Sequence, residues 1–576
     1  MDRSRIIYIP IRKVISLLVL SLVLASLANI SLVASESVSL TGVVTSDAEG
    51  FMEGVVVSAK RMGGTINVAV VTDKQGRYSF PSSRVPSGTY SLSVRAIGYV
   101  PNSDVTAVVG SAKKEVNIKL AKTSDLASQL SDLEWLMSAP GTEDQKQKIF
   151  VSCNSCHSLS AIFKSTYDQA GWLPTLVRMH NWVLGSLPEK PILSPFHAGL
   201  HKGDAEFAQY LSSINLSSKS AHDFELKTLP RPQGEETKVI ITEYDLPRPD
   251  AEPHDAVVDK EGMVWYSDYS EPIVGRLDPR TGDVKEWTDP LSKPGYSGMF
   301  LDLELDQEGN PWVGRPGPGF NGFAKFDKKT QEFTNWTDPI EIDQSETKKD
   351  RGDINFIIPM ASTGFVAIAP DGKVWNRDNF THKVFRLDPT TGKIATFDQF
   401  PPEIMSKDYQ GPEHRVYGIT ADSEGNLYEA DIEAGNIAKV DGATGKVSMY
   451  PIPTRGAGPR RMHMDSDGHL WIGEHYAKKI AMLDTKTGQI QEWSLPIPWY
   501  APYDVAPDKS GSVWTASMTS DVIIRFDPKT GKTMHYLLPS LDVNPRRVDV
   551  DNSGRLPVFW LGENHRARIA KVEPTE

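Results

Sequence analysis

Cysteine is scarce in this chain of 576 residues, which holds only two, Cys153 and Cys156. A disulfide framework of the kind that stabilises small secreted domains is excluded, because a single bridge would use both thiols. Blocks of basic residues are missing as well, and the formal net charge is −12. The sequence therefore predicts no nucleic-acid partner.

Long apolar runs are also missing, apart from one at residues 14–34. Several basic residues precede that run, as in a secretory signal, and small residues near its end offer cleavage sites. Its length approaches the ~20 residues of a membrane helix, so an uncleaved membrane anchor is the alternative. In both cases residues 1–35 predict that the rest of the chain is exported to the periplasm or another extracytoplasmic space.

The two cysteines belong to a C-x-x-C-H run at residues 153–157. This pattern is typical of covalently attached haem c, in which both thiols bond the vinyl groups and the histidine, here His157, is the proximal iron ligand. A redox dithiol or half of a zinc site is the alternative, but zinc would require two further ligands at matching spacing. Export agrees with the haem interpretation, and we expect one haem c.

Helical patterns surround this motif. Thr142 begins a segment whose apolar residues recur at helical spacing up to Cys153, and a second such segment covers residues 205–211. A helix that ends at C-x-x-C-H, followed by a closing helix, resembles the small class I cytochromes c. The resemblance implies a small all-α cytochrome c domain over residues 140–216.

The sixth position on the iron requires another ligand. Met179 is the only methionine between the motif and the repeats described below, and we expect it to be the distal ligand. The alternative is that Met179 packs in the core of an amphipathic helix. The rival ligands are His180, His197 and His201, so bis-histidine ligation stays open.

Residues 38–122 show the alternation of apolar and polar residues that is typical of strands, for example at 38–43 and 90–94. Closely spaced turn signals between such runs predict an all-β sandwich. The runs at 72–80 and 86–90 resemble carboxypeptidase regulatory-like domains, which have a prealbumin-like or carbohydrate-binding-like fold. The resemblance implies a spacer or adhesion module rather than a peptidase.

The remaining residues, 238–576, contain an internal repeat in which a turn with Asp and Gly precedes an aromatic residue. The turn aspartates are Asp259, Asp306, Asp371, Asp422, Asp465, Asp508 and Asp551. Such repeats with short strands predict a β-propeller. The last copy ends without room for its final strand, which residues 239–244 can supply. We therefore expect seven blades closed by an N-terminal strand, with six as the alternative.

Alignment of the copies places two rings of side chains around the central channel. The first ring is His254, Leu301, Tyr417, Arg460, Tyr503 and Arg546. The second is Asp268, Arg315, Asp378, Asp431, Glu474, Ser517 and Glu563. Either these residues satisfy one another as ion pairs, or their carboxylates bind a divalent cation such as Mg²⁺ or Ca²⁺.

The repeats resemble the streptogramin (virginiamycin B) lyase family of seven-bladed propellers over nearly all of residues 238–576. Residues 252–254 (E-P-H) and 265–268 (W-Y-S-D) match its E-x-H and W-x-x-E motifs. The resemblance implies that Glu252 and Asp268 hold Mg²⁺, while His254 is the catalytic base that opens a cyclic ester by elimination.

Two positions depart from that family's pattern. Asp268 replaces a glutamate, and Arg546 stands where the lyases have a substrate-binding histidine.

The sequence predicts an exported multidomain electron-transfer protein that binds haem c. Its propeller would bind a small-molecule substrate or a redox partner protein. A Mg²⁺-dependent lyase resembling virginiamycin B lyase and a non-catalytic binding or scaffold protein are the alternatives. The enzyme class stays open between an oxidoreductase acting through the haem domain and a lyase acting through the propeller.

Overall fold

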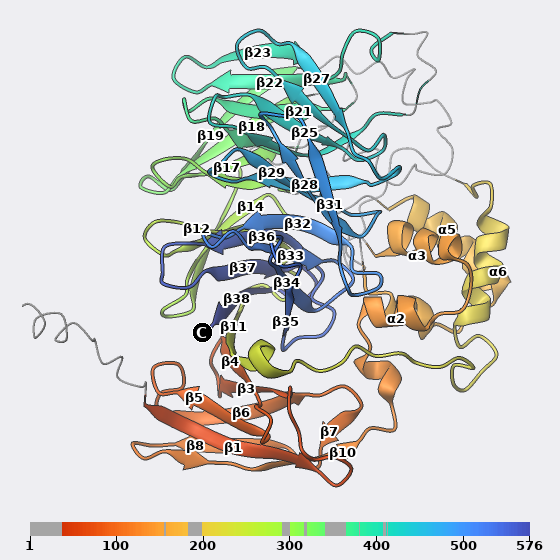
Figure 1. Ribbon diagram of the computed structural model, residues 1–576, viewed down its shortest axis with the longest axis vertical. Helices are drawn as coiled ribbons and strands as arrows, with labels where there is room; N and C mark the ends of the chain where they lie inside the picture. The colour runs from red at the N-terminus through yellow and green to blue at the C-terminus, as the bar shows by residue number, and fades with distance from the viewer. Residues whose placement is uncertain are drawn as a thin grey trace, which may run out of the picture.

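The computed structural model describes residues 37–154, 157–182, 199–290, 300–315, 320–339, 364–379, 381–406, 411 and 413–576. A β-sandwich lies at one end of the molecule, four-stranded sheets make up most of the rest, and the helices pack along one side of those sheets (Figure 1). The chain is therefore mostly β, as predicted. The expected signal segment, Cys156 and His197 lie outside the described residues.

The sandwich is built from ten short strands. They are β1 Val38–Ser46, β2 Gly50–Phe51, β3 Val56–Arg61, β4 Ile66–Val71, β5 Arg77–Pro81, β6 Gly88–Arg95, β7 Tyr99–Pro101, β8 Val105–Val109, β9 Lys114–Glu115 and β10 Ile118–Lys122. Along β6, Tyr90 and Leu92 are buried, whereas Ser91 and Ser93 are exposed. This period of two is the expected result of one strand face covering a core, and the predicted sandwich is confirmed.

The helices follow in one block after the sandwich. They are α2 Asp132–Ser138, α3 Glu143–Cys153, α4 Ser160–Phe163, α5 Gln169–His180 and α6 Asp204–Ile214, with 3₁₀ helices η1 Leu126–Gln129 and η2 Gly234–Thr237. Helices α2 and α3 both begin with a capping box, in which the hydroxyls of Ser131 and Thr142 accept from backbone N–H groups. Such caps satisfy donors that a helix start otherwise leaves unbonded.

Six four-stranded sheets and four strands of an eight-stranded sheet, named here blades 1 to 7, form the propeller within the described residues. Blade 1 has β12 Pro253–Val258, β13 Val264–Asp268, β14 Ile273–Asp278 and β15 Asp283–Thr288. Blade 2 has β16 Leu303–Leu305, β17 Pro311–Arg315, β18 Phe320–Asp327 and β19 Glu332–Pro339. Blade 3 has β20 Ala367–Ile368, β21 Val374–Asp378, β22 Lys383–Asp388 and β23 Lys393–Asp398.

The later blades repeat this order. Blade 4 has β24 Val416–Ala421, β25 Leu427–Asp431, β26 Asn436–Val440 and β27 Val447–Pro451. Blade 5 has β28 Pro459–Met464, β29 His469–Glu474, β30 Lys479–Asp484 and β31 Ile490–Ser494. Blade 6 has β32 Pro502–Pro507, β33 Val513–Ser517, β34 Val522–Phe526 and β35 Thr533–Leu537. Blade 7 has β36 Pro545–Asp551, β37 Val558–Glu563, β38 Arg568–Pro574 and, from the N-terminal side, β11 Val239–Asp245.

Strand β11 closes the ring. It pairs antiparallel with β38 along its whole length, from Val239 opposite Pro574 to Asp245 opposite Arg568. Closure by a strand from the other end of the repeat stabilises a propeller, because blade 7 would otherwise end in an unpaired edge. The sequence-based expectation of seven blades with this closure agrees with the observed strand order.

The repeated aspartate shapes each blade's turn. In blade 1, Asp259 accepts hydrogen bonds from the backbone of Glu261 and Met263 (2.9 Å each) and from the indole of Trp265 (2.9 Å). The indoles of Trp471 and Trp514 bond their own turn aspartates in the same way, at 3.0 and 2.9 Å. The Asp-to-Trp spacing therefore repeats because one carboxylate must reach both the turn backbone and a buried indole.

The sandwich and the propeller share a sheet. Strand β4 pairs antiparallel with β11, so that Ala69 lies opposite Ile241, and blade 7 continues into an eight-stranded sheet that ends at β8. Arg95 of the sandwich also pairs with Asp521 of blade 6 at 2.7 Å. A cavity of about 530 Å³ lies at this junction. The sequence does not predict this joining of the two domains.

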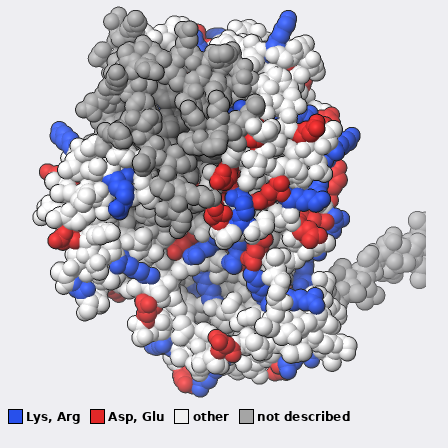
Figure 2. Space-filling model, turned by 180° about the vertical axis from the view of Figure 1, so that it is seen from behind, with Lys and Arg blue, Asp and Glu red and all other residues white. Residues whose placement is uncertain are grey.

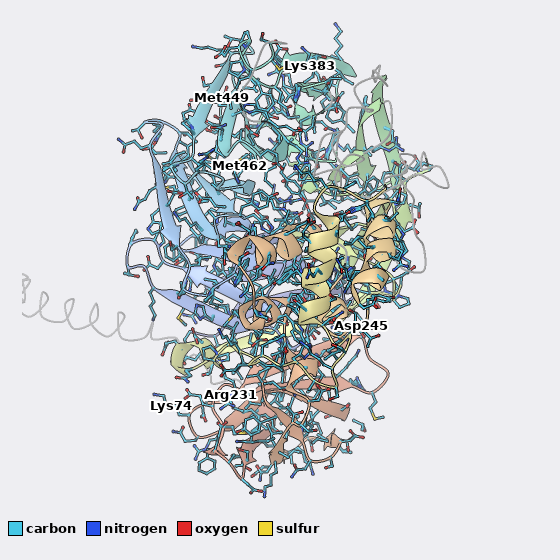
Figure 3. All side chains as sticks on the ribbon, turned by 90° about the vertical axis from the view of Figure 1, so that its right-hand side faces the viewer. Lys74, Arg231, Asp245, Lys383, Met449 and Met462 are labelled. Atoms are coloured by element: carbon cyan, nitrogen blue, oxygen red, sulfur yellow. The ribbon has the colours of Figure 1, made fainter. Side chains whose placement is uncertain are left out.

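Further ion pairs hold the junction from both sides. Arg231, in the linker after the helices, pairs with Glu49 at 2.5 Å, and Asp245 pairs with Lys60 and with Arg568 (Figure 3). On the face seen in Figure 2, basic side chains are interspersed with acidic ones. In the part of the chain that the structure describes, no helix has the length and apolarity of a membrane span.

Candidate functional site

Helix α3 brings the C-x-x-C-H motif to the propeller. It buries Ile149 and Phe150 and ends at Cys153, which is half buried. The ring of Phe150 lies 4.8 Å from that of His475 in blade 5. Phe150 belongs to a hydrophobic core that α2, α3 and α6 share with Trp499 and other residues of blades 5 and 6. The motif therefore begins one turn after a direct contact with the propeller.

Asp132, at the start of α2, holds the turn that contains the motif. Its carboxylate accepts from Asn154 Nδ2 (2.5 Å), Ser158 Oγ (2.9 Å) and the Leu159 backbone N–H (2.7 Å). Asp132 is 4% exposed. Burial, with the nearby Asp542 carboxylate, raises its pKa well above the usual range. The buried carboxyl of Asp132 thus bonds Asn154 within the motif, and Ser158 and Leu159 directly after it.

His157 presents one ring nitrogen for ligation. Its Nδ1 lies 3.0 Å from the carbonyl oxygen of Ser158. Because a carbonyl oxygen only accepts, Nδ1 carries the hydrogen and Nε2 carries the lone pair. Metal-binding histidines commonly donate their second N–H in this way. The donor set of Cys153 and His157 therefore fits a covalently attached haem.

Two contacts fix the motif on the propeller rim. Asn544, just before β36, donates from Nδ2 to the carbonyl oxygens of Asn154 (3.1 Å) and Met518 (3.2 Å). The backbone N–H of Leu133 donates to the carbonyl of Thr519 at 2.6 Å. Hydrogen bonds from two blades therefore hold the helices in one orientation, in addition to the shared core.

His565 faces the same region from the turn between β37 and β38. Its backbone N–H donates to Val543 at 3.3 Å, and its side-chain Nε2 is buried without a hydrogen-bond partner. Burial, followed by the charge of Arg546, lowers its pKa well below the usual range. His565 is therefore a neutral imidazole near the motif.

Of the residues considered for the distal side, Met179 and His180 lie on α5, and His201 lies just before α6. Met179 is half buried near the end of α5. The next residue, His180, lies with Nε2 3.0 Å from Asp204 Oδ2, and its ring stacks on that of His201 at 4.0 Å. Asp204 thus engages His180, and Met179 stays the predicted ligand.

The first predicted ring does converge in the propeller channel. His254 is fully buried, with Nδ1 2.7 Å from Asp255 and Nε2 3.0 Å from the hydroxyl of Tyr503. The hydroxyls of Tyr503 and Tyr417 are 2.5 Å apart. The guanidinium of Arg460 lies over both tyrosine rings, 4.6 Å from Tyr417 and 4.2 Å from Tyr503.

These bonds have a direction. Although burial opposes it, Arg461 and His254 lower the pKa of Asp255, which is ionised and accepts from His254 Nδ1. Nε2 of His254 therefore accepts from Tyr503, whose oxygen in turn accepts from Tyr417. Burial lowers the pKa of His254 to about 3, so the ring is neutral. The hydrogen bonds therefore run in one direction, from Tyr417 through Tyr503 and His254 to the buried carboxylate of Asp255.

The residues expected to hold a divalent cation are arranged differently. Asp268 pairs through Oδ2 with the guanidinium of Arg248, and its Oδ1 accepts from the backbone of Ser270 at 2.8 Å. Burial, with the Asp268 carboxylate adding to it, raises the pKa of Glu252 to about 8. Both nitrogens of His254 are already bonded.

This set does not fit Mg²⁺ or Ca²⁺, which prefer several ionised oxygens. One carboxylate is held by an arginine, and burial favours the protonated form of the other.

Other members of the second ring pair locally. Asp431 accepts from His414 at 2.6 Å, and Arg315 pairs with Asp289 at 2.6 Å. These two pairs lie within or beside their own blades, whereas both carboxylate oxygens of Glu474 and of Glu563 are buried without a hydrogen-bond partner.

Asp132 and Asn544 touch the motif and His565 lies near it, and none of the three was expected from the sequence. A serine followed by an acidic residue at position 132 predicts a helix start, but not a partner. Asn544 precedes the aligned Arg546 by two positions, which is the one available signal for its place at the rim. Nothing local distinguishes His565.

Comparison with known proteins bears on the two β parts. The model of the Virginiamycin B lyase family matches residues 402–576. The propeller is virginiamycin B lyase-like. The Carboxypeptidase regulatory-like domain matches residues 39–121, which confirms the sandwich assignment. None of the curated proteins matches the chain.

Solved structures include relatives of the propeller. Selenomethionine-substituted virginiamycin B lyase from Staphylococcus aureus is 17% identical, with a TM-score of 0.47 over 58% of this chain and 99% of that chain. A streptogramin B lyase structure is 21% identical, with a TM-score of 0.48 over 59% of this chain and 99% of that one. Neither family match covers the helices, so the interpretation of the C-x-x-C-H motif depends on its sequence and geometry.

Proposed function

We propose that this protein is an exported c-type cytochrome whose virginiamycin B lyase-like propeller binds the molecule that exchanges electrons with the haem. The observation that carries the proposal is the position of the C-x-x-C-H motif. Helix α3 ends at the motif's first cysteine while packing on the propeller channel mouth, and His157 has the tautomer that iron requires.

The residues of the motif would hold the haem. The thiols of Cys153 and Cys156 would bond its vinyl groups, Nε2 of His157 would ligate the iron, and Met179 would take the opposite side. A bound haem c supplies a carrier of single electrons. Asp132 restrains the turn through three hydrogen bonds, which keeps the proximal histidine in a fixed orientation.

A packed path joins the motif to the channel. Phe150 contacts His475, whose Nε2 lies 2.7 Å from Arg460, and Arg460 covers Tyr503. Because these side chains are in contact, a molecule bound at the channel mouth would lie close to the motif. The propeller would therefore determine which molecule reaches the haem.

The lyase alternative has the family match of residues 402–576 in its favour. The pairing of Arg248 with Asp268 and the engaged nitrogens of His254 oppose it. Turnover of a cyclic ester that EDTA and His254→Ala abolish, but Cys153→Ser leaves intact, would support the lyase instead.

The decisive experiment is a visible spectrum of the full chain, expressed with haem-maturation machinery. We expect the α-band of a reduced c-type haem, retained after denaturation because the attachment is covalent. Its absence from the correctly folded protein would refute the proposal. Cys153→Ser should weaken attachment, and Ser165→Ala, which leaves the motif intact, is the control.

The distal ligand has a separate test. Ferric haem with Met ligation shows a weak long-wavelength band that bis-histidine haem lacks. We expect this band in the native protein and its loss in Met179→Leu. Met449→Leu, in β27 of blade 4 (Figure 3), is the matched control. A band that survives Met179→Leu would exclude this methionine.

A further inference from the structure

A small cavity of about 40 Å³ lies between α3 and the channel mouth. Phe150 and Val151 cover it from the helical side, and its propeller wall includes Tyr417, Arg460 and His475. The cavity is thus bounded by the last turn of α3 before Cys153 and by the first ring of the propeller. It has room for about one to three water-sized groups.

Arg460 brings a positive charge to this wall without a negative partner. Its Nη1 lies 2.7 Å from Nε2 of His475, and its Nη2 lies 3.5 Å from the hydroxyl of Tyr417. Its Nε is buried and makes no hydrogen bond. Arg460 is half buried, and among the described residues no carboxylate pairs with it, so a bound anion would meet no competing internal partner.

The neighbouring residue shows the contrast. Arg461 lies 3.3 Å from Asp255 and 3.3 Å from Asp302, and Arg547 lies 2.9 Å from Asp302. These two arginines are therefore compensated within the protein. All three have a buried Nε without a hydrogen-bond partner, but of the three only Arg460 lines the cavity.

The groups around Arg460 are neutral. Nδ1 of His475 lies 3.2 Å from the carbonyl of Pro502, so Nδ1 carries the hydrogen and Nε2 accepts from Arg460. Burial, followed by the charge of Arg460, lowers the pKa of His475 well below its usual range. The hydroxyl of Tyr417 donates a hydrogen bond to the hydroxyl oxygen of Tyr503. The wall therefore offers positive charge and N–H donors to a ligand, and no anion.

We propose that this cavity binds a small oxyanion, such as a short carboxylate, with Arg460 as its anchor. A guanidinium pairs well with an oxyanion because its N–H groups lie in one plane and match the oxygen spacing. The cavity volume restricts the ligand to a few heavy atoms. Small oxyanions would then be the substrate class of the proposed cytochrome, and in that respect the inference rests on the proposed function.

The experiment uses the full-length protein and sodium formate as the probe, at constant ionic strength against sodium chloride. Calorimetric titration should show saturable binding, and formate should raise the thermal midpoint. In Arg460→Met the affinity should fall by at least about tenfold, the size expected for a lost charged hydrogen bond. Arg455→Met, which removes an exposed charge next to the same blade, should bind formate like the native protein.

Folding is checked independently. Arg460→Met should keep the far-ultraviolet circular dichroism of the native protein. Arg460→Lys keeps the charge but lacks Nε, so it should show intermediate affinity. No formate binding by the native protein beyond chloride, or unchanged affinity in Arg460→Met, would overturn the site.

Failure of the haem proposal is distinguishable. The titration is repeated on the Cys153→Ser/Cys156→Ser protein, which cannot attach haem. Binding there supports the oxyanion site even if the haem proposal fails. If the haem-loaded protein does not bind formate, the oxyanion site is refuted while the cytochrome proposal stays intact.

Discussion

Asp132 connects the start of α2 to Asn154 of the C-x-x-C-H motif and to Ser158 and Leu159 directly after it, through three hydrogen bonds. Asp132→Ala would leave Asn154 Nδ2, Ser158 Oγ and the Leu159 N–H without acceptors in a buried site. Each unsatisfied buried donor costs about 1–3 kcal/mol, so we expect the three together to lower the free energy of unfolding by about 3 kcal/mol or more. Urea unfolding of the two proteins measures it.

The control is Asp144→Ala, in the exposed first turn of α3. It removes an acidic residue of the same type from the adjacent helix and should cost about 0.5 kcal/mol or less. Equal losses in both variants would contradict the role assigned to Asp132.

Glu429 on β25 predicts a pH dependence. It is fully buried, accepts from Gln399 at 3.0 Å, and burial raises its pKa to about 8. In the unfolded chain the same group ionises near pH 4.5. Its contribution is therefore complete below pH 4.5 and is lost as the pH rises towards 8, because the folded state then holds a proton that the unfolded state has released.

Glu429→Gln removes this titration. When the pH is raised from 5 to 8, the free energy of unfolding of the variant should increase by roughly 1–3 kcal/mol relative to that of the native protein. Urea unfolding at the two pH values gives the difference. Glu424→Gln, at an exposed turn of the same blade, should show none. An equal gain in unfolding free energy in both variants would mean that the effect comes from the change in net charge and not from the burial of Glu429.

At the scale of elements, β4 is the strand that joins two domains. Ala69 lies between Ser58 of β3 and Ile241 of β11. Ala69→Pro would remove a backbone donor in the interior of a sheet and should cost about 3 kcal/mol or more. We expect a lower thermal midpoint and faster proteolytic release of the sandwich from the propeller.

Ala69→Ser is the control for this substitution. It keeps the backbone N–H and a small side chain, so the sandwich should stay attached. If both variants released the sandwich at the native rate, the shared sheet would not be what holds the domains together, and the ion pair of Arg95 with Asp521 would be the next candidate.

For the whole molecule, the contact of α3 with blade 5 should couple the helices to the propeller. Phe150 is 2% exposed and packs on His475, so Phe150→Ala should cost about 3–5 kcal/mol. Because it lies at the boundary, hydrogen exchange should increase both in α3 and around residue 475, as mass spectrometry can measure.

Phe163→Ala is the matched control. Phe163 is fully buried and stacks on Trp135 within the helical part, with ring centroids 4.7 Å apart. Its removal should increase exchange among the helices but not in blade 5. The same exchange pattern in both variants would show that the helical part and the propeller respond as one unit.

Local patterns account for most of what could be predicted. In blades 1, 2, 5 and 6 the turn aspartate is close in sequence to the backbone and indole that it bonds, so Asp259 and Trp265 reveal the turn without knowledge of the fold. The same reasoning found β11, since the last copy lacked a strand. It also placed Tyr417, Arg460 and Tyr503 together, because equivalent positions of a closed repeat must meet at its axis.

Motif matching was less informative about the charge on each group. Glu252, His254 and Asp268 match the lyase pattern, but Arg248 comes from an unaligned segment and pairs with Asp268. A motif states which residue types are present, whereas protonation depends on burial and on neighbours brought in from elsewhere.

The sequence by itself determined the elements and their repetition: the sandwich strands, the helix that ends at Cys153, the seven copies and their closure. These depend on interactions between residues near one another in the chain or related by the repeat. Only the tertiary structure decided that β4 extends blade 7, that Asp132 and Asn544 hold the motif, and that Arg460 lies uncompensated beneath α3. Those contacts join segments that are distant in sequence, and their stability comes from shape and charge across surfaces that exist only after each part has folded.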